Sequence, residues 1–203
     1  MIKYLVWSCL VICGGLRVHQ PEKPQVHILF VGNSLTYTNN LPQLVKQVAA
    51  QNGFTVQTEM LAYANYALED HWSDGELQKL IASNRFDYVI VQQGPSSQAD
   101  GKSMLLDYGA RIKSLCDKHK SQLAFYMVWP ARVNYSMFDG VIANYTLAAT
   151  ETNSILCPVG KVWKNYFDTT HDFSYYGPDG FHPSVAGSKR AAEVIFESLA
   201  IPK

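Results

Sequence analysis

The sequence has no excess of either charge and few cysteines, and both features exclude classes of function. Lysine plus arginine and aspartate plus glutamate each number 17 among 203 residues. No overall electrostatic field therefore favours nucleic acid, and we expect no nucleic-acid partner. The four cysteines form no CxxC pair and do not cluster with histidines, so we expect no metal site.

The sequence also lacks an apolar run long enough to span a membrane, which needs about 20 residues. The most apolar run, Tyr4 to Cys13, follows a lysine at position 3 and precedes two glycines. This layout is typical of a secretory signal peptide, with a buried first strand as the alternative. We expect residues 1–20 to be the signal peptide, with cleavage between Gly15 and Lys23. The mature protein is then secreted or periplasmic and has no integral membrane segment.

Two cysteines in this leader raise the question of a lipid anchor. The residues before Cys9 and Cys13 match a lipidation site poorly, so a lipoprotein is the less favoured interpretation. After cleavage only Cys116 and Cys157 remain. The sequence leaves open whether they form a disulfide or stay as two buried thiols, because it does not give the distance between them.

Beyond the leader, no repeat, low-complexity tract or long linker interrupts the chain, and 47% of all residues are hydrophobic. Near-continuous apolar runs separated by helical patterns predict a parallel sheet covered on both faces. We expect one three-layer α/β/α domain over residues 25–203, with a mostly parallel sheet of about five strands. The expected strands are 26–31, 54–61, 86–92, 123–129 and 155–163, and the expected helices are 41–52, 74–84, 102–119, 138–153 and 183–199.

Ligands of such sheets bind outside the carboxyl ends of the strands. The first predicted strand is followed by GNSLTYTNN, which presents Ser34 at that edge. A serine hydroxyl needs a base to take its proton, and the base needs a third group to orient it. Among the six histidines, His182 has the most constrained surroundings, YYGPDGFHPS, with Asp179 three residues before it. Ordinary turn residues and a capped helix start are the alternative for both segments.

Together the two segments resemble the SGNH (GDSL-type) hydrolase superfamily. The stretch Gly32 to Thr36 (GNSLT) matches its first block, and Asp179 to Pro183 (DGFHP) matches its last block, Asp-x-x-His-Pro. With the α/β alternation between them, the resemblance covers nearly all of residues 25–203. It implies a flavodoxin-like sheet and a catalytic triad without a cofactor: Ser34 as nucleophile, His182 as general base and then acid, and Asp179 as the group that orients His182.

The resemblance also implies an oxyanion hole, which the backbone N–H of Ser34 and a glycine N–H of the second block usually form. In AYANYALEDHW the aligned residue is Asn65, with Ala64 as the near alternative. A backbone donor does not depend on the side chain, and asparagine tolerates a left-handed conformation better than most residues. We therefore expect Asn65 to supply this N–H.

The third block departs most from the family pattern, Gly-x-Asn-Asp, because VQQGPSSQ contains no asparagine. We expect Gln93 to replace that side-chain donor, since its amide has the hydrogens that an oxyanion needs. Ser96 or Ser97 is the alternative if Gly94 aligns with the family's glycine.

Three other residues are candidates for lining the substrate pocket: Asn33, His71 and Trp72. For the last two, which belong to LEDHW, a capped and solvated helix start is the alternative interpretation. Asn39 and Asn40 are expected to cap the helix that follows them, with a proline early in that helix.

These features predict a secreted serine esterase that acts on carboxylic esters of a small molecule or a polysaccharide. The chain lacks a long apolar lid, which argues against a dedicated lipase, and its tyrosine- and tryptophan-rich loops favour O-acetyl or other short-acyl groups on carbohydrate. Acyl transfer to another alcohol uses the same residues. A non-catalytic glycan-binding protein of the same fold and a flavin-phosphate binder are the alternatives from other classes.

Overall fold

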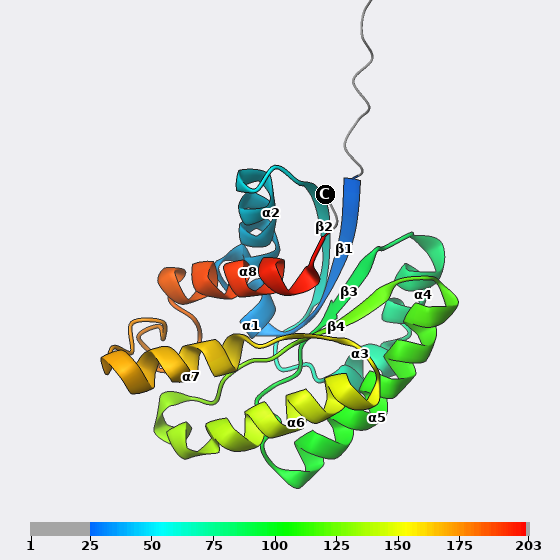
Figure 1. Cartoon of the computed structure of the whole chain (residues 1–203). Coiled ribbons are helices and arrows are strands. Elements are labelled where there is room, and N and C mark those ends of the chain that lie inside the picture. Colours follow the sequence, from blue (N-terminus) through cyan, green and yellow to red (C-terminus); the bar gives the residue numbers. More distant parts are fainter. Residues whose placement is uncertain (1–24, 202–203) are drawn as a thin grey trace, which may run out of the picture.

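A computed structural model describes residues 25–201, so the predicted signal peptide lies outside the described residues. Within that range the model forms a five-stranded parallel sheet in the order β2-β1-β3-β4-β5 (Figure 1). This confirms the expected fold class. The strands are β1 (Gln25–Gly32), β2 (Thr55–Ala62), β3 (Tyr88–Val91), β4 (Gln122–Tyr126) and β5 (Ile155–Cys157).

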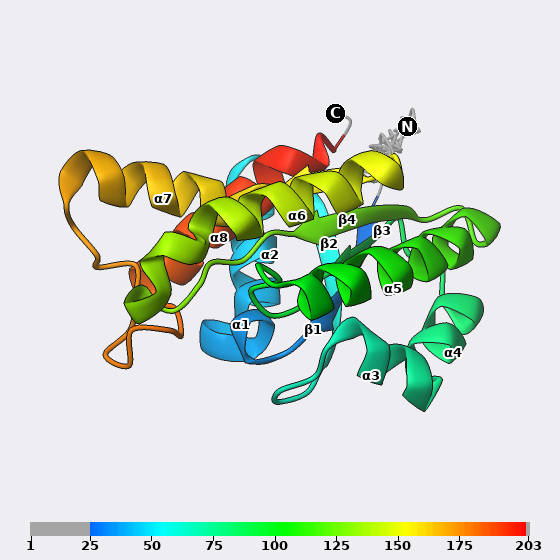
Figure 2. The ribbon, with the colours of Figure 1, turned by 90° about the horizontal axis from the view of Figure 1, so that it is seen from below.

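Helices cover both faces of the sheet, as the apolar strands require. Helices α2 and α8 pack against each other on one face, and α3, α4 and α5 pack together on the other (Figures 1 and 2). The helices are α1 (Ser34–Tyr37), α2 (Leu41–Gln51), α3 (Leu68–Asp74), α4 (Glu76–Ser83), α5 (Ala99–Lys118), α6 (Phe138–Glu151), α7 (Val159–Thr170) and α8 (Val185–Leu199), with 3-10 turns at Thr38–Asn40 and Arg132–Met137.

The last expected strand, 155–163, is wrong beyond its first three residues. Only Ile155–Cys157 pairs with β4, and helix α7 begins at Val159. Pro158 stands between the two elements, and its missing N–H and restricted φ end the strand there. Gly160 then passes so close to the segment after β4 that an added Cβ would lie 2.0 Å from the Val128 carbonyl oxygen. The expected strand 123–129 is also too long, since pairing stops at Tyr126.

Both cysteines of the described chain are buried and free, which answers the question that the sequence left open. Burial raises the pKa of Cys116 to about 12 and that of Cys157 to about 12, so neither thiol ionises at neutral pH. The two side chains belong to the core. Separately, none of the helices within residues 25–201 combines the length and apolar character that crossing a membrane requires.

Candidate active site

The turn that carries Ser34 forms because the chain leaves β1 through a glycine, an asparagine and a serine. Asn33 caps α1 by accepting a hydrogen bond from Leu35 N–H on its side-chain oxygen, at 3.2 Å. Gly32 is needed for space: a Cβ there would lie 2.4 Å from Thr36 Oγ1 and 2.5 Å from Gln92 Oε1. Ser34 is thus the first helical residue and lies at the carboxyl edge of the sheet.

Gln92 holds this turn from beneath. Its side-chain oxygen accepts hydrogen bonds from Asn33 N–H and from the Thr36 hydroxyl, both at 2.9 Å, and the residue is only 1% exposed. Because Asn33 N–H can only donate, the oxygen must face the turn. The amide nitrogen is then buried without a partner among the described residues. Such an unpaired donor costs about 1–3 kcal/mol, so the contacts that hold the Ser34 turn lower the stability of the fold.

Gln92 was not among the site residues predicted from the sequence, which in this loop were Gln93, Ser96 and Ser97. The signal that would have found it is strand pairing. Val31 and Val91 are register partners in β1 and β3, so the residue after Val91 must lie beside Gly32. A polar side chain at that buried position has to bond to the turn that follows Gly32.

We expect Gln92→Met to lower kcat by about 100-fold with little change in KM, because a displacement of about 1 Å in the nucleophile costs that much. Methionine keeps the length of the side chain but leaves Asn33 N–H and the Thr36 hydroxyl without an acceptor. Steady-state kinetics on a short aryl ester measures the effect. The matched control is Gln98→Met, since Gln98 is exposed and its side chain makes no cap hydrogen bond. A folded Gln92→Met with wild-type kcat contradicts this role.

His182 and Asp179 meet Ser34 as the sequence predicted. His182 Nε2 lies 3.0 Å from Ser34 Oγ, and Nδ1 lies 2.6 Å from Asp179 Oδ2. The hydrogen bond from His182 lowers the pKa of Asp179, with further lowering from the backbone N–H groups of Phe181 and His182, which donate to Oδ1 at 2.9 Å. An ionised carboxylate accepts the Nδ1 proton, so Nε2 is left with a lone pair that faces the serine hydroxyl.

The loop that carries this pair is held in a narrow hairpin by its own backbone. Gly177 N–H donates to the His182 carbonyl at 2.7 Å, and Tyr176 and Pro183 form an antiparallel bridge. Gly180 has φ of +67°, which glycine adopts without strain. The hairpin folds Asp179 back onto the imidazole ring, as the Gly- and Pro-rich sequence indicated.

Aromatic side chains fasten this hairpin to the segment that follows β4. Trp129 Nε1–H donates to the Phe181 carbonyl at 3.0 Å, and the Tyr176 hydroxyl donates to the Pro130 carbonyl at 2.8 Å. Trp129 is itself stacked on Trp163 of α7, with ring centroids 3.5 Å apart. The position of His182 therefore depends on the core beneath it.

Asn39 joins the serine side of the site to the histidine side. Its amide nitrogen donates to the Pro183 carbonyl and to Ser188 Oγ, both at 3.0 Å. Asn40 occupies the N-cap position of α2, as predicted, although its side chain makes no cap hydrogen bond. The prediction is wrong for Asn39, whose side chain bonds to Pro183 and Ser188 instead. Both asparagines have positive φ, 56° and 53°, and asparagine tolerates that conformation. The expected early proline, Pro42, is in the first turn of α2.

The backbone N–H groups of Ser34 and Asn65 make no hydrogen bond within residues 25–201. Asn65 has φ of 64° in the turn closed by Tyr66 N–H and the Tyr63 carbonyl, a position that requires positive φ in a type II turn. The Asn33 amide donates to the Tyr66 carbonyl at 3.0 Å and so ties the two turns together. Both donors are thus free, and the turn that carries Asn65 is bonded to the residue before Ser34.

The side-chain amide of Gln93 is fully hydrogen-bonded within the protein. Its amide nitrogen donates to Ser96 Oγ at 2.8 Å and to the Gly101 carbonyl at 2.9 Å, while its oxygen accepts Leu68 N–H at 3.3 Å. Ser96 Oγ in turn donates to the Gly94 carbonyl at 2.9 Å. In this arrangement neither of these two candidates has a hydrogen left for an oxyanion. Ser97, the other candidate, makes no side-chain hydrogen bond among the described residues.

His71 and Trp72 lie in α3, and the helix forms as expected, but it is not simply solvated. His71 is 1% exposed and donates from Nε2 to the Gly32 carbonyl at 2.8 Å. Burial lowers its pKa, against the opposite effects of the Gly32 carbonyl and Asp70, so the ring is neutral. Trp72 packs beside Arg111 of α5, whose guanidinium lies 6.0 Å from its ring centroid. His71 thus supports the turn that carries Ser34, whereas Trp72 contacts α5.

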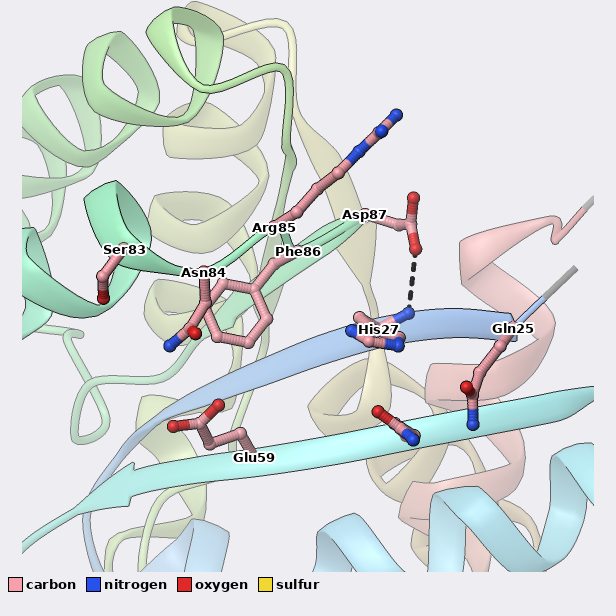
Figure 3. A pocket seen from close by; sticks show the side chains of 9 residues that line it. Gln25, His27, Glu59, Ser83, Asn84, Arg85, Phe86 and Asp87 are labelled. Carbon is pink, nitrogen blue, oxygen red and sulfur yellow. Dashed lines mark hydrogen bonds between the residues drawn. The ribbon is translucent and has the colours of Figure 1, made fainter.

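Two cavities lie at opposite ends of the strands. The first, about 270 Å³, is lined by Asn33 and Asn65 next to Ser34, and neither His71 nor Trp72 lines it. The second, about 610 Å³, lies at the amino ends of β1 and β3 (Figure 3), where Asp87 accepts the His27 backbone N–H at 2.8 Å. The larger cavity is therefore remote from Ser34. No metal-binding group of three His, Cys, Asp or Glu residues occurs within residues 25–201.

Comparisons with known proteins identify relatives by structure. No family model matches the sequence, and no curated protein matches it. A protein from Slackia heliotrinireducens, provisionally described as an SGNH hydrolase, is 25% identical with a TM-score of 0.73, covering 87% of this chain and 100% of that one. The lipase/acylhydrolase from Enterococcus faecalis is 15% identical with a TM-score of 0.69, covering 86% and 95%. A variant acetyl xylan esterase from Geobacillus stearothermophilus is 18% identical with a TM-score of 0.62, covering 88% and 97%.

Proposed function

Because this chain belongs to the SGNH hydrolase superfamily, we propose that it is a serine esterase that hydrolyses short-acyl carboxylic esters at Ser34. The supporting observation is the continuous chain of hydrogen bonds from Ser34 Oγ through the His182 ring to Asp179, at 3.0 and 2.6 Å. Those distances are within the range for direct proton transfer from a serine to a histidine.

The reaction consists of acylation of Ser34 and hydrolysis of the acyl-enzyme, and the same side chains act in both steps. His182 Nε2 takes the Ser34 proton as Oγ attacks the acyl carbon, and the N–H groups of Ser34 and Asn65 bind the oxyanion. His182 then gives that proton to the leaving alcohol, and an acyl-Ser34 ester remains. Water enters, loses a proton to His182 and attacks the ester, and the acid leaves as Ser34 regains its proton. No cofactor takes part.

The proposed substrates are O-acetyl and other short-acyl esters, carried by carbohydrate. One similar structure is an acetyl xylan esterase, and the turns at this site present exposed tyrosines that suit a sugar ring. Tyr37 follows Ser34 by three residues and is 37% exposed, and Tyr63 precedes Asn65 by two and is 41% exposed. The proposal includes secretion with removal of residues 1–20, so that such a polymer is reached outside the cytoplasm.

A non-catalytic glycan-binding protein of the same fold is the second candidate. It is favoured by one observation, the use of both Gln93 amide hydrogens inside the protein, which leaves the oxyanion without the usual side-chain donor. A fluorophosphonate probe separates the two candidates, because it labels only a serine whose hydroxyl is activated. Labelling of Ser34 supports the esterase, and an unlabelled protein supports the binder.

The experiment that tests the esterase is a panel of acetylated sugars and short aryl esters. We expect the purified wild type to release acetate from at least one acetylated sugar, and Ser34→Ala to release none above the uncatalysed rate. Transfer of the acyl group to an added alcohol is followed in the same samples. Absence of hydrolysis and transfer on every ester would refute the proposal.

A further inference from the structure

The smaller cavity beside Ser34 is built from the turns after β2 and β3. Its wall contains Asn65, which carries a free N–H, and the small residues Ala67 and Gly94; Met104 of α5 contributes the one long apolar side chain. Its volume is about 270 Å³. That lies below the roughly 300–1,000 Å³ typical of pockets for drug-sized ligands, so the cavity suits a small group.

The geometry of an acyl transfer decides which part of an ester lies there. In the tetrahedral intermediate the oxyanion lies near the Ser34 and Asn65 N–H groups, and the leaving oxygen lies near His182 Nε2, from which it takes a proton. His182 precedes α8, which packs with α2 on one face of the sheet. The cavity wall comes from the turn before α3 and from α5, on the other face (Figure 1). The acyl chain must point away from the leaving group, toward α5.

We propose that this cavity binds the acyl chain of the substrate and that Met104 and Gly94 limit the length of that chain. The inference rests on the proposed esterase function and adds the residues that select the acyl group. Ala67, Pro95 and Met104 contribute apolar surface to the wall. The polar side chains of Gln93 and Ser96 also line it, but their hydrogens are already bonded within the protein, so the cavity fits a hydrocarbon chain better than a sugar. The sugar would then lie on the His182 side, outside the cavity.

Two substitutions change the size of the cavity in opposite directions. Met104→Ala removes a flexible side chain and enlarges it. Gly94→Val reduces it without a clash, because a Cβ at Gly94 has no atom within 4 Å and its φ is not positive. Gly101 is unsuitable, since a Cβ there would lie 3.1 Å from Ser96 Cα. Met60→Ala is the matched control, because Met60 is 43% exposed on β2 and does not line the cavity.

The measurement is kcat/KM on p-nitrophenyl acetate, butyrate, hexanoate and octanoate. We expect the wild type to prefer acetate and butyrate. Met104→Ala should raise the hexanoate-to-acetate ratio about 10-fold or more, and Gly94→Val should lower the butyrate-to-acetate ratio by a similar factor, because each methylene in a pocket is worth about 10–200-fold. Met60→Ala should keep the wild-type ratios.

Failure of this inference differs from failure of the proposed function. If the wild type hydrolyses these esters and both cavity variants keep its chain-length ratios, the acyl chain lies elsewhere and the esterase stands. If the wild type hydrolyses none of them, nor any acetylated sugar, the esterase and this inference fall together. Should Gly94→Val not fold, the hexanoate-to-acetate ratio of Met104→Ala decides alone.

Discussion

Ser34→Ala is expected to lower kcat for ester hydrolysis by about 10⁴-fold or more, with a thermal unfolding midpoint close to that of the wild type. The substitution removes the atom that forms the acyl-enzyme in the proposed reaction, and the remaining hydrogen-bond donors provide a small residual rate. The fold should persist because the turn is held by Asn33 and Gln92, while Ser34 Oγ bonds only to His182 among the described residues. Kinetics on a short aryl ester measures the loss of kcat, and thermal unfolding of the same protein measures the midpoint.

Ser114→Ala is the matched control for this prediction. Ser114 is an exposed serine of α5 without a side-chain hydrogen bond among the described residues, so its loss should leave kcat and fluorophosphonate labelling unchanged. Wild-type turnover by folded Ser34→Ala protein, free of contaminating esterase, would exclude Ser34 as the nucleophile.

His182→Asn is expected to lower kcat by a comparable factor, about 10⁴-fold, because Ser34 Oγ bonds to no other base within residues 25–201. The double variant Ser34→Ala/His182→Asn should be no slower than either single variant, since the two groups act as one unit. Fluorophosphonate labelling of Ser34 should slow in parallel with turnover. If His182→Asn labels as fast as the wild type, another residue activates the serine.

Asp179→Asn tests how much the carboxylate contributes to kcat, in comparison with His182→Asn. Its side chain is 52% exposed, so water can take over part of the stabilisation of the imidazolium. An amide can also keep the Oδ1 contacts to Phe181 N–H and His182 N–H. We expect a smaller loss of kcat, about 10²-fold. A loss equal to that of His182→Asn would mean that the carboxylate does more than hold the ring.

The parts of the site that follow from short-range chemistry were predictable from the sequence. An apolar run that stops at Gly32 indicates a strand end, and glycines and prolines around His182 indicate a tight turn that brings Asp179 back to the ring. The strand end and the tight turn both depend on the backbone conformations that a few adjacent residues prefer. The family resemblance added that the two segments belong together, and the structure brings Ser34 and His182 within 3.0 Å.

The errors have a common physical cause. Gln93 was predicted to be the oxyanion donor, with Ser96 or Ser97 as alternatives, because the sequence shows which side chains can donate but not which neighbours already accept their hydrogens. Asn39 was interpreted as a cap because its contacts, Pro183 and Ser188, lie 144 and 149 residues further along the chain. Helix α7 was missed because a single proline separates it from an apolar strand.

The sequence by itself therefore determined the α/β alternation and the turn chemistry of the two segments that carry Ser34, Asp179 and His182, because these depend on neighbours along the chain. Only the tertiary structure decided that Gln92 supports the Ser34 turn and that both amide hydrogens of Gln93 bond to Ser96 and Gly101. It also decided that residues of α5 line a small cavity near Ser34. Those outcomes depend on strand register and on which face each helix covers, and hydrogen bonds between distant residues exist only once both are set.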